Sequence, residues 1–268
     1  MKKNESALAA KAKGFYRLRE QFVIPQARHI VSHEHRLILG ISPKSGCTVA
    51  SKLFFGHLGL LEEALKLDPW IHRYRIGYRK NNRVSLKNLS SPDYFSFKVV
   101  RSPYTRAVSS YTHTMRTKIS KVALLKYLGY SSKDEVSFYD FMRFLSSIDM
   151  RQANRHYGLQ ALMQEGKAFT YDYVLKLEAL EEGLAEIETR FGKKFSIEKK
   201  VKGSVHHTDK GKSAGDCVAK TPFGSLPKKT DGSLLQPPYA DFYDPTAREL
   251  VETVYRRDFE LYDYCFDL

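Results

Sequence analysis

A chain of 268 residues in which 42% are hydrophobic and 13% aromatic can bury a core, which excludes an intrinsically disordered protein. Its 44 Lys and Arg against 30 Asp and Glu leave a formal net charge of +14, which favours anionic partners such as phosphorylated or sulfated small molecules, acidic glycans, nucleic acid or a lipid surface. The three cysteines include no C-x-x-C pair, so the sequence indicates neither a disulfide framework nor a zinc site.

The N-terminal residues 1–34 carry Ala, Lys and Arg at helical spacing and predict a helical extension at the periphery of the fold. They contain no apolar run of signal-peptide length, and no later segment has the unbroken apolar stretch that a membrane span requires. We therefore expect a cytoplasmic protein without a membrane span.

A strand, a turn and a helix are predicted next. The apolar run RLILGI (36–41) is typical of a fully buried strand, and TVASKLFFGHLG (48–59) places Val49, Leu53 and Phe54 on one helical face. The turn between them, SPKSGCT (42–48), lies where a helix N-terminus can receive an anion.

A second strand and helix follow the same order. YFSFKVV (94–100) is rich in aromatic residues and Val, and RSPYTRAVSSYTHTM (101–115) has Ser102 in the N-cap position and Pro103 at the first helical position. Residues 117–165 then predict a helical insertion, in which Ser137 and Asp140 have the spacing of a capping box.

A third strand, about 171–177, precedes a helix that ends at Gly192. Residues 199–240 are rich in Lys, Gly, Ser and Pro and predict a long loop, after which Asp244 caps the last helix. Alternating strands and helices predict an α/β fold: a three-layer, P-loop NTPase-like arrangement with a mostly parallel central sheet flanked by helices, in which residues 35–268 form one domain. Ligands of such sheets bind beyond the carboxyl ends of the strands.

The turn at 42–48 differs from a nucleotide-triphosphate loop. In the pattern G-x-x-x-x-G-K-[ST] the lysine directly follows the second glycine, whereas Cys47 stands there in this chain and Lys44 lies inside the turn. The amides of residues 45–48 can still face an anion at the start of the helix. The second strand ends in Arg101 rather than in a carboxylate that could hold Mg²⁺, which favours a second anion, and we predict no metal site.

Together, PKSGCT (43–48) and VRSPYTRAVSSY (100–111) resemble the two nucleotide-binding motifs of the PAPS-dependent sulfotransferases. The resemblance is to the carbohydrate sulfotransferase branch that includes the HNK-1 and chondroitin enzymes (sulfotransferase family 2), and NRHYGLQALM (154–163) is similar to a further segment of that branch. It implies that the 5′-phosphosulfate of PAPS is bound by Lys44, Ser45, Gly46, Cys47 and Thr48, and the 3′-phosphate by Arg101 and Ser109.

The chemistry of sulfuryl transfer assigns roles within this set. Charge grows on the oxygen between sulfur and the departing phosphate, and a cation directed there stabilises mainly the transition state, so Lys44 is the candidate. Arg106, at helical spacing from Ser102 and Ser109, is a further candidate for gripping the 3′-phosphate. The acceptor hydroxyl must lose a proton, and His156 is the first choice of general base. The other candidates for the base are His57, His113, His206 and Glu178.

The sequence therefore predicts a metal-independent enzyme that moves a sulfuryl group from PAPS to a hydroxyl of an acceptor, which the resemblance implies is a carbohydrate. Two alternatives stay open: a P-loop-like kinase or NTPase, which requires Mg²⁺, and a basic nucleic-acid-binding module. The cationic and aromatic stretch RYRIGYRKNNRVSLK (73–87) is compatible with a polyanionic acceptor and with single-stranded nucleic acid.

Overall fold

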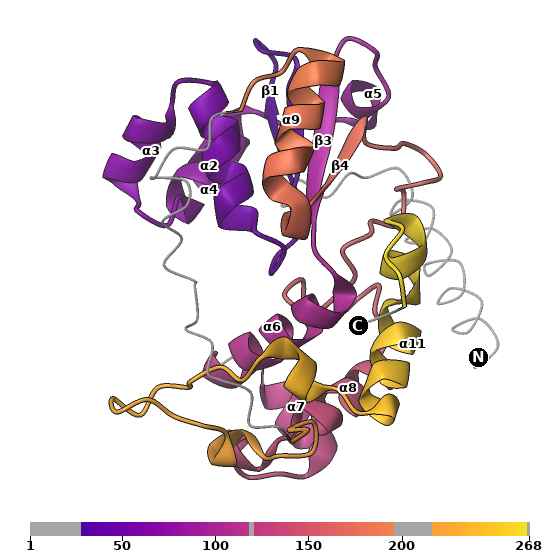
Figure 1. Ribbon diagram of the computed structural model, residues 1–268. Coiled ribbons are helices and arrows are strands. Elements are labelled where there is room, and N and C mark those ends of the chain that lie inside the picture. Colours follow the sequence, from indigo (N-terminus) through magenta and orange to yellow (C-terminus); the bar gives the residue numbers. More distant parts are fainter. Residues whose placement is uncertain (1–27, 118–120, 196–215, 267–268) are drawn as a thin grey trace, which may run out of the picture.

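The computed structural model describes residues 28–117, 121–195 and 216–266, and its centre is a four-stranded sheet (Figure 1). The strands are β1 (His29–Ser32), β2 (Leu37–Gly40), β3 (Phe95–Val100) and β4 (Tyr173–Lys176), in the order β1-β2-β3-β4. β1 is antiparallel to β2, and the other pairs are parallel. The predicted α/β class, the mostly parallel sheet and all three predicted strands are confirmed.

β1 corrects the prediction of a helical extension over residues 1–34. Residues 29–32 are extended and buried, and their backbone pairs with β2 from Ser32 opposite Leu37 to His29 opposite Gly40. The short run HIVS is apolar enough to complete the sheet edge, and the pairing overrides the helical spacing of its neighbours. Residues 1–27 of the expected extension lie outside the described residues.

One face of the sheet carries α2 (Cys47–His57) and α9 (Leu180–Phe191), with α3 (Leu61–Leu67) and α4 (His72–Asn81) beside them (Figure 1). Alternate strand residues such as Leu39, Phe97 and Leu175 pack there against Phe54 and Ile187. α9 ends as predicted, with Gly192 in the left-handed conformation, whereas α3 and α4 were not predicted from the sequence. The buried apolar contacts fix α2 and its N-terminus against the carboxyl end of β2.

The opposite face is covered more thinly in the described part of the chain. α5 (Leu86–Leu89) supplies Leu89, and the segment between residues 160 and 171 supplies Leu162, Phe169 and Tyr171, all packed near Ile38 of β2. The sheet is thus flanked by helices, although an irregular segment shares the second face with the short helix.

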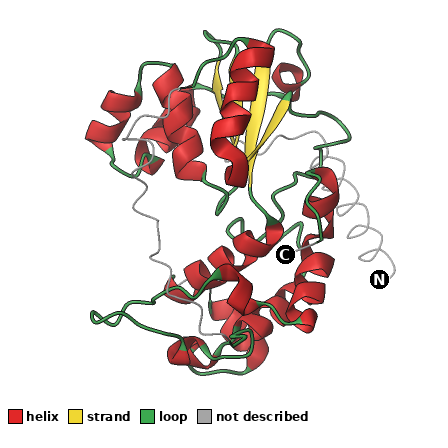
Figure 2. Ribbon diagram, viewed as in Figure 1, coloured by secondary structure: helices red, strands yellow, loops and turns green. Residues whose placement is uncertain are grey.

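A helical lobe lies beyond the carboxyl ends of the strands (Figures 1 and 2). It contains α6 (Pro103–Arg116), α7 (Val122–Leu128), the 3₁₀ turn η2 (Lys133–Glu135), α8 (Phe138–Ser146) and α11 (Pro245–Leu261). Ser137 and Asp140 form the predicted capping box at the start of α8. Phe138, Phe141, Met142 and Leu145 are fully buried in this lobe.

The helical insertion predicted for residues 117–165 is helical only as far as Ser146. Residues 147–165 run through turns that are held partly by their own backbone hydrogen bonds, and they return toward the sheet. There the backbone of Gln160 bonds the buried side chains of Asp258 and Lys98. Of the long loop predicted for 199–240, residues 216–240 contain η4 (Phe223–Ser225) and the start of η5 (Tyr239–Phe242), and 199–215 lie outside the described residues. Asp244 caps α11 as predicted, accepting from the amide of Ala247 at 2.7 Å.

Candidate active site

The turn after β2 has a backbone shape that suits an anion. Lys44 has φ of 67° and Gly46, the N-cap residue of α2, has φ of 72°. A Cβ on Gly46 would come within 2.7 Å of the Leu177 side chain and would be strained at this φ, so glycine is favoured at this position. The amides of Cys47 and Thr48 have no partner among the described residues, as expected of the first turn of a helix. The turn therefore offers unpaired N–H groups at the positive end of α2.

Ser45 differs from its predicted part in that cradle. Its amide donates to the Ser42 carbonyl at 3.2 Å, and its hydroxyl donates to Oε1 of Gln160 at 2.5 Å. The residue is fully buried. In this structure Ser45 stabilises the turn, whereas the amides of residues 46–48 have no hydrogen-bond partner among the described residues.

Lys44 is half-buried in a cationic neighbourhood. Burial is the largest cause that lowers the pKa of its ammonium to about 8, and the guanidinium groups of Arg101 and Arg116 act in the same direction. The Cys47 sulfur opposes this shift. A lysine held among arginines gains most from an anion that neutralises all of them, so the local charge favours a phosphate- or sulfate-sized ligand.

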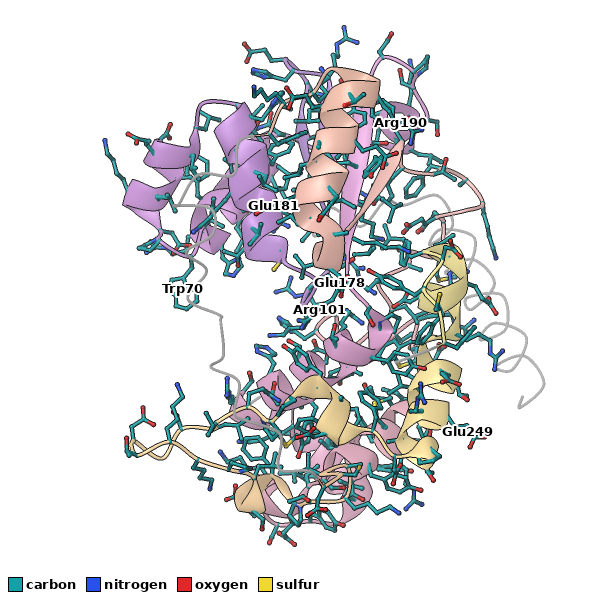
Figure 3. All side chains as sticks on the ribbon, in the orientation of Figure 1. Trp70, Arg101, Glu178, Glu181, Arg190 and Glu249 are labelled. Carbon is teal, nitrogen blue, oxygen red and sulfur yellow. The ribbon has the colours of Figure 1, made fainter. Side chains whose placement is uncertain are left out.

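Arg101 brings the second predicted segment against the first. Its Nη1 donates to the Lys44 carbonyl at 3.2 Å, its Nε donates to Oγ1 of Thr105 at 2.9 Å, and its guanidinium lies 5.1 Å from the ring centroid of Tyr239. Figure 3 shows Arg101 beside Glu178, where α6 leaves the sheet. The motifs at 43–48 and 100–111 thus meet at the carboxyl ends of adjacent strands. Ser109 lies two turns further along α6 and is half-buried.

Arg106 is not available to grip a ligand, which corrects its predicted role. Its side chain has no exposed surface, and it donates to the carbonyl groups of Pro43 at 3.2 Å and Gly158 at 2.7 Å. Asp258 lies 4.0 Å from its Nη1. Arg106 therefore stabilises the turn through its hydrogen bond to the Pro43 carbonyl.

Comparison with known proteins agrees with this geometry. The model of the sulfotransferase family matches residues 27–265. The chain belongs to the sulfotransferase family. Carbohydrate sulfotransferase 14 of Danio rerio is 25% identical over 178 residues, which are 61% of this chain and 48% of that relative, so the chain spans about half the length of the curated relative. No solved structure gives a significant match.

In this member of the sulfotransferase family His156 lies close to the cationic turn. Burial, followed by the charges of Arg155 and Lys44, lowers the pKa of its imidazole to about 4, so the ring is neutral at pH 7. Its Nδ1 lies 3.0 Å from Oδ1 of Asn154, and this oxygen also accepts from the His156 amide at 3.0 Å. The carboxamide oxygen selects the Nδ1–H tautomer and leaves Nε2 with a free electron pair.

The other candidate bases are distributed differently. The His113 ring on α6 packs against the His156 ring, with 4.6 Å between the ring centroids, so both imidazoles lie in the same part of the site. His57 lies at the far end of α2, where its Nδ1 is 2.9 Å from the Lys194 carbonyl, and it is too remote to act on a ligand at the helix N-terminus. His206 lies outside the described residues.

Glu178 caps α6 rather than the helix that follows it in the chain. Its Oε1 accepts from the amide of Ser102 at 2.9 Å, at the start of α6, and its Oε2 accepts from the Tyr264 hydroxyl at 3.0 Å. A carboxylate at this position stabilises the positive end of α6 next to Arg101. Glu178 therefore acts as an N-terminal cap of α6, although in the chain it follows β4 and precedes α9.

Four residues of the site were not singled out from the sequence: Gln160, Tyr239, Lys98 and Asp258. Gln160 bridges Ser45 and Arg101, and Tyr239 comes from the loop that carries no motif. Lys98 could have been noticed as the one charged residue inside the predicted strand YFSFKVV. Within the described ranges no group of three or more His, Cys, Asp or Glu is arranged to hold a metal ion, and no helix is both long and apolar enough to cross a membrane.

Proposed function

We propose that this protein transfers the sulfuryl group of PAPS to a hydroxyl of a carbohydrate acceptor. The observation that carries the proposal is the contact between the Lys44 carbonyl and the Arg101 guanidinium, because it joins two anion-binding segments into one site. A nucleotide with phosphates on both ends of its ribose matches two adjacent cationic segments. Membership of the family and the similarity to carbohydrate sulfotransferase 14 support the donor and the class of acceptor.

The residues of the site divide the chemistry between them. PAPS supplies a sulfuryl group, which passes to the acceptor oxygen as the bond from sulfur to the 5′-phosphate oxygen breaks and PAP leaves with that electron pair. The amides of residues 46–48 hold the 5′ end, and Lys44 stabilises the charge that develops on the bridging oxygen. Arg101, which lies just before α6, and Ser109 on α6 hold the 3′-phosphate. Nε2 of His156 accepts the proton of the acceptor hydroxyl.

The donor assignment is tested by the thermal stability of the full chain with PAP, AMP or ATP with Mg²⁺. A ligand that binds only the folded state raises the apparent Tm, and at equal concentration we expect PAP to raise it most, because only PAP engages both segments. Equal shifts with PAP and AMP would contradict the assignment of Arg101 to the 3′-phosphate. The largest shift with ATP and Mg²⁺ would favour a kinase instead.

The general base is tested by His156→Ala. We expect kcat for sulfuryl transfer to fall about a hundredfold, since general-base catalysis contributes ~10²–10⁴-fold, while the Kd for PAP changes little. His57→Ala removes an imidazole at the far end of α2 and is the matched control, for which kcat should stay within about twofold of the wild type. A His156→Ala enzyme with unchanged kcat would remove this residue from the mechanism.

A further inference from the structure

Gln160 makes contact with both anion-binding segments through one carboxamide. Its Oε1 accepts from the Ser45 hydroxyl at 2.5 Å and from the Arg101 amide at 2.9 Å, and its Nε2 donates to the Arg101 carbonyl at 2.8 Å. Both lone pairs of the oxygen and one of the two N–H donors are therefore used to join residues 45 and 101. The residue is fully buried, so water does not compete for these bonds.

The backbone of Gln160 is held as firmly as its side chain. Its amide donates to Asp258 of α11 at 2.8 Å, and the next amide, of Ala161, donates to the same carboxylate at 2.8 Å. Its carbonyl accepts from Nζ of Lys98 at 2.8 Å and from the guanidinium of Arg28 at 2.7 Å. A peptide bonded on both sides by charged groups cannot shift without leaving a buried charge unsatisfied.

Lys98 itself belongs to a buried polar network. Its ammonium lies 2.6 Å from Glu165 and 2.6 Å from the Tyr262 hydroxyl, and burial lowers its pKa to about 8. These groups lie under the site and cannot touch a ligand, since Lys98 and Glu165 are almost completely buried. They hold the Gln160 backbone in the position from which its side chain bonds Ser45 and Arg101.

We propose that Gln160 is a positioning residue that sets the separation between the 5′-phosphosulfate turn and the Arg101 segment. The inference rests on the function proposed above. A rigid link of this kind matters for a ligand that must engage both segments at once, because its two charged ends have a fixed spacing. A ligand with one phosphate can follow a displaced turn, whereas one with two phosphates cannot. Gln160 therefore determines selectivity for the bisphosphorylated nucleotide rather than affinity for phosphate as such.

The test is the ratio of the Kd values for AMP and PAP in Gln160→Met, which keeps the length and volume of the side chain without its hydrogen bonds. We expect the preference for PAP to fall about tenfold, as for the loss of one to two buried hydrogen bonds. The KM for PAPS should rise, while the KM for the acceptor stays unchanged. Gln236→Met is the matched control, because Gln236 is also buried and, within the described part of the chain, its side chain donates to the neighbouring Pro237 carbonyl alone. In this variant the ratio should not change.

A merely structural role would lower the Tm of Gln160→Met and leave the ratio as in the wild type, and that result would overturn the inference. Should this variant fail to fold, Ser45→Ala carries the same test, because it removes only the hydroxyl that donates to Gln160. Its ratio should fall about threefold, and an unchanged ratio would equally overturn the inference. A wild type that binds AMP as tightly as PAP would refute both the proposed function and the role of Gln160. A wild type that prefers PAP, together with variants that keep this preference, would refute the role of Gln160 alone, so the two failures are distinguishable.

Discussion

Replacing Lys44 with Ala is expected to lower kcat for sulfuryl transfer by about 10²–10³-fold, the loss typical of a group that stabilises charge in the transition state. Lys44 lies in the left-handed region at the tip of the turn, between unpaired helix amides and Arg101. Among the described residues its ammonium makes no hydrogen bond or ion pair, whereas Arg101 is bonded to Thr105 and to the Lys44 carbonyl. The loss should therefore appear mainly in kcat, with a smaller change in the Kd for PAP.

The pKa of Lys44 adds a pH dependence with a definite sign. Because this pKa is lowered to about 8 in the free enzyme, the ammonium is charged below pH 8 and loses its proton as the pH rises through that value. We expect kcat/KM for PAPS, which reports the free enzyme, to fall above about pH 8. In the complex the bound anions favour the charged form, so kcat should fall only at higher pH.

Two further variants make this prediction sharp. Lys44→Arg keeps a charge that is not lost in this range, so the fall above pH 8 should disappear even if kcat is reduced. Lys66→Ala removes one positive charge from the exposed side of α3 and is the control for net charge. A Lys44→Ala enzyme that retains kcat within about threefold, or an Arg variant with the wild-type pH profile, would exclude Lys44 as the transition-state cation.

Much of the structure of the sheet and of the helices that directly follow its strands could be predicted from local sequence. The strand at 37–40, the turn with Gly46 and the helix from Cys47 form a short contiguous unit, and its signals are periodicity, a glycine and a helix start. The same holds for β3 and α6. Two such units place Lys44 and Arg101 at the same edge of a parallel sheet, as the predicted order of strands and helices implies, and the structure adds the contact between them.

The remainder of the site depends on contacts between residues far apart in the chain. Gln160 lies 115 residues from Ser45 and 98 from Asp258, and no period or motif links them. Arg106 shows a second limit of the sequence analysis. Its helical spacing from Ser109 gives no information about whether its side chain is exposed or, as in the structure, buried against Pro43 and Gly158. Local spacing predicts which residues share a face, and only the tertiary packing decides whether that face meets solvent or the core.

Asp258→Ala is expected to destabilise the protein by about 3–5 kcal/mol, as for other changes that break a buried ion pair by removing one partner. Burial raises the pKa of the Asp258 carboxyl, so the carboxylate is itself held at a cost, and the loss comes from the groups that it leaves behind. These are the amides of Gln160 and Ala161 and the fully buried guanidinium of Arg106. The measurement is the free energy of unfolding from urea titrations.

The cause of that loss can be separated from the loss of packing. Glu260→Ala, in the same helix but exposed, should change the free energy of unfolding by no more than about 0.5 kcal/mol. If the main cause is the Arg106 guanidinium left buried without its partner, the double variant Asp258→Leu with Arg106→Met should be more stable than Asp258→Leu alone, because both charges are then absent. If the double variant is the less stable one, the hydrogen bonds of the Arg106 guanidinium to the Pro43 and Gly158 carbonyls stabilise the fold by more than the burial of its charge costs. The turn at residues 42–48 would then depend on Arg106 independently of Asp258.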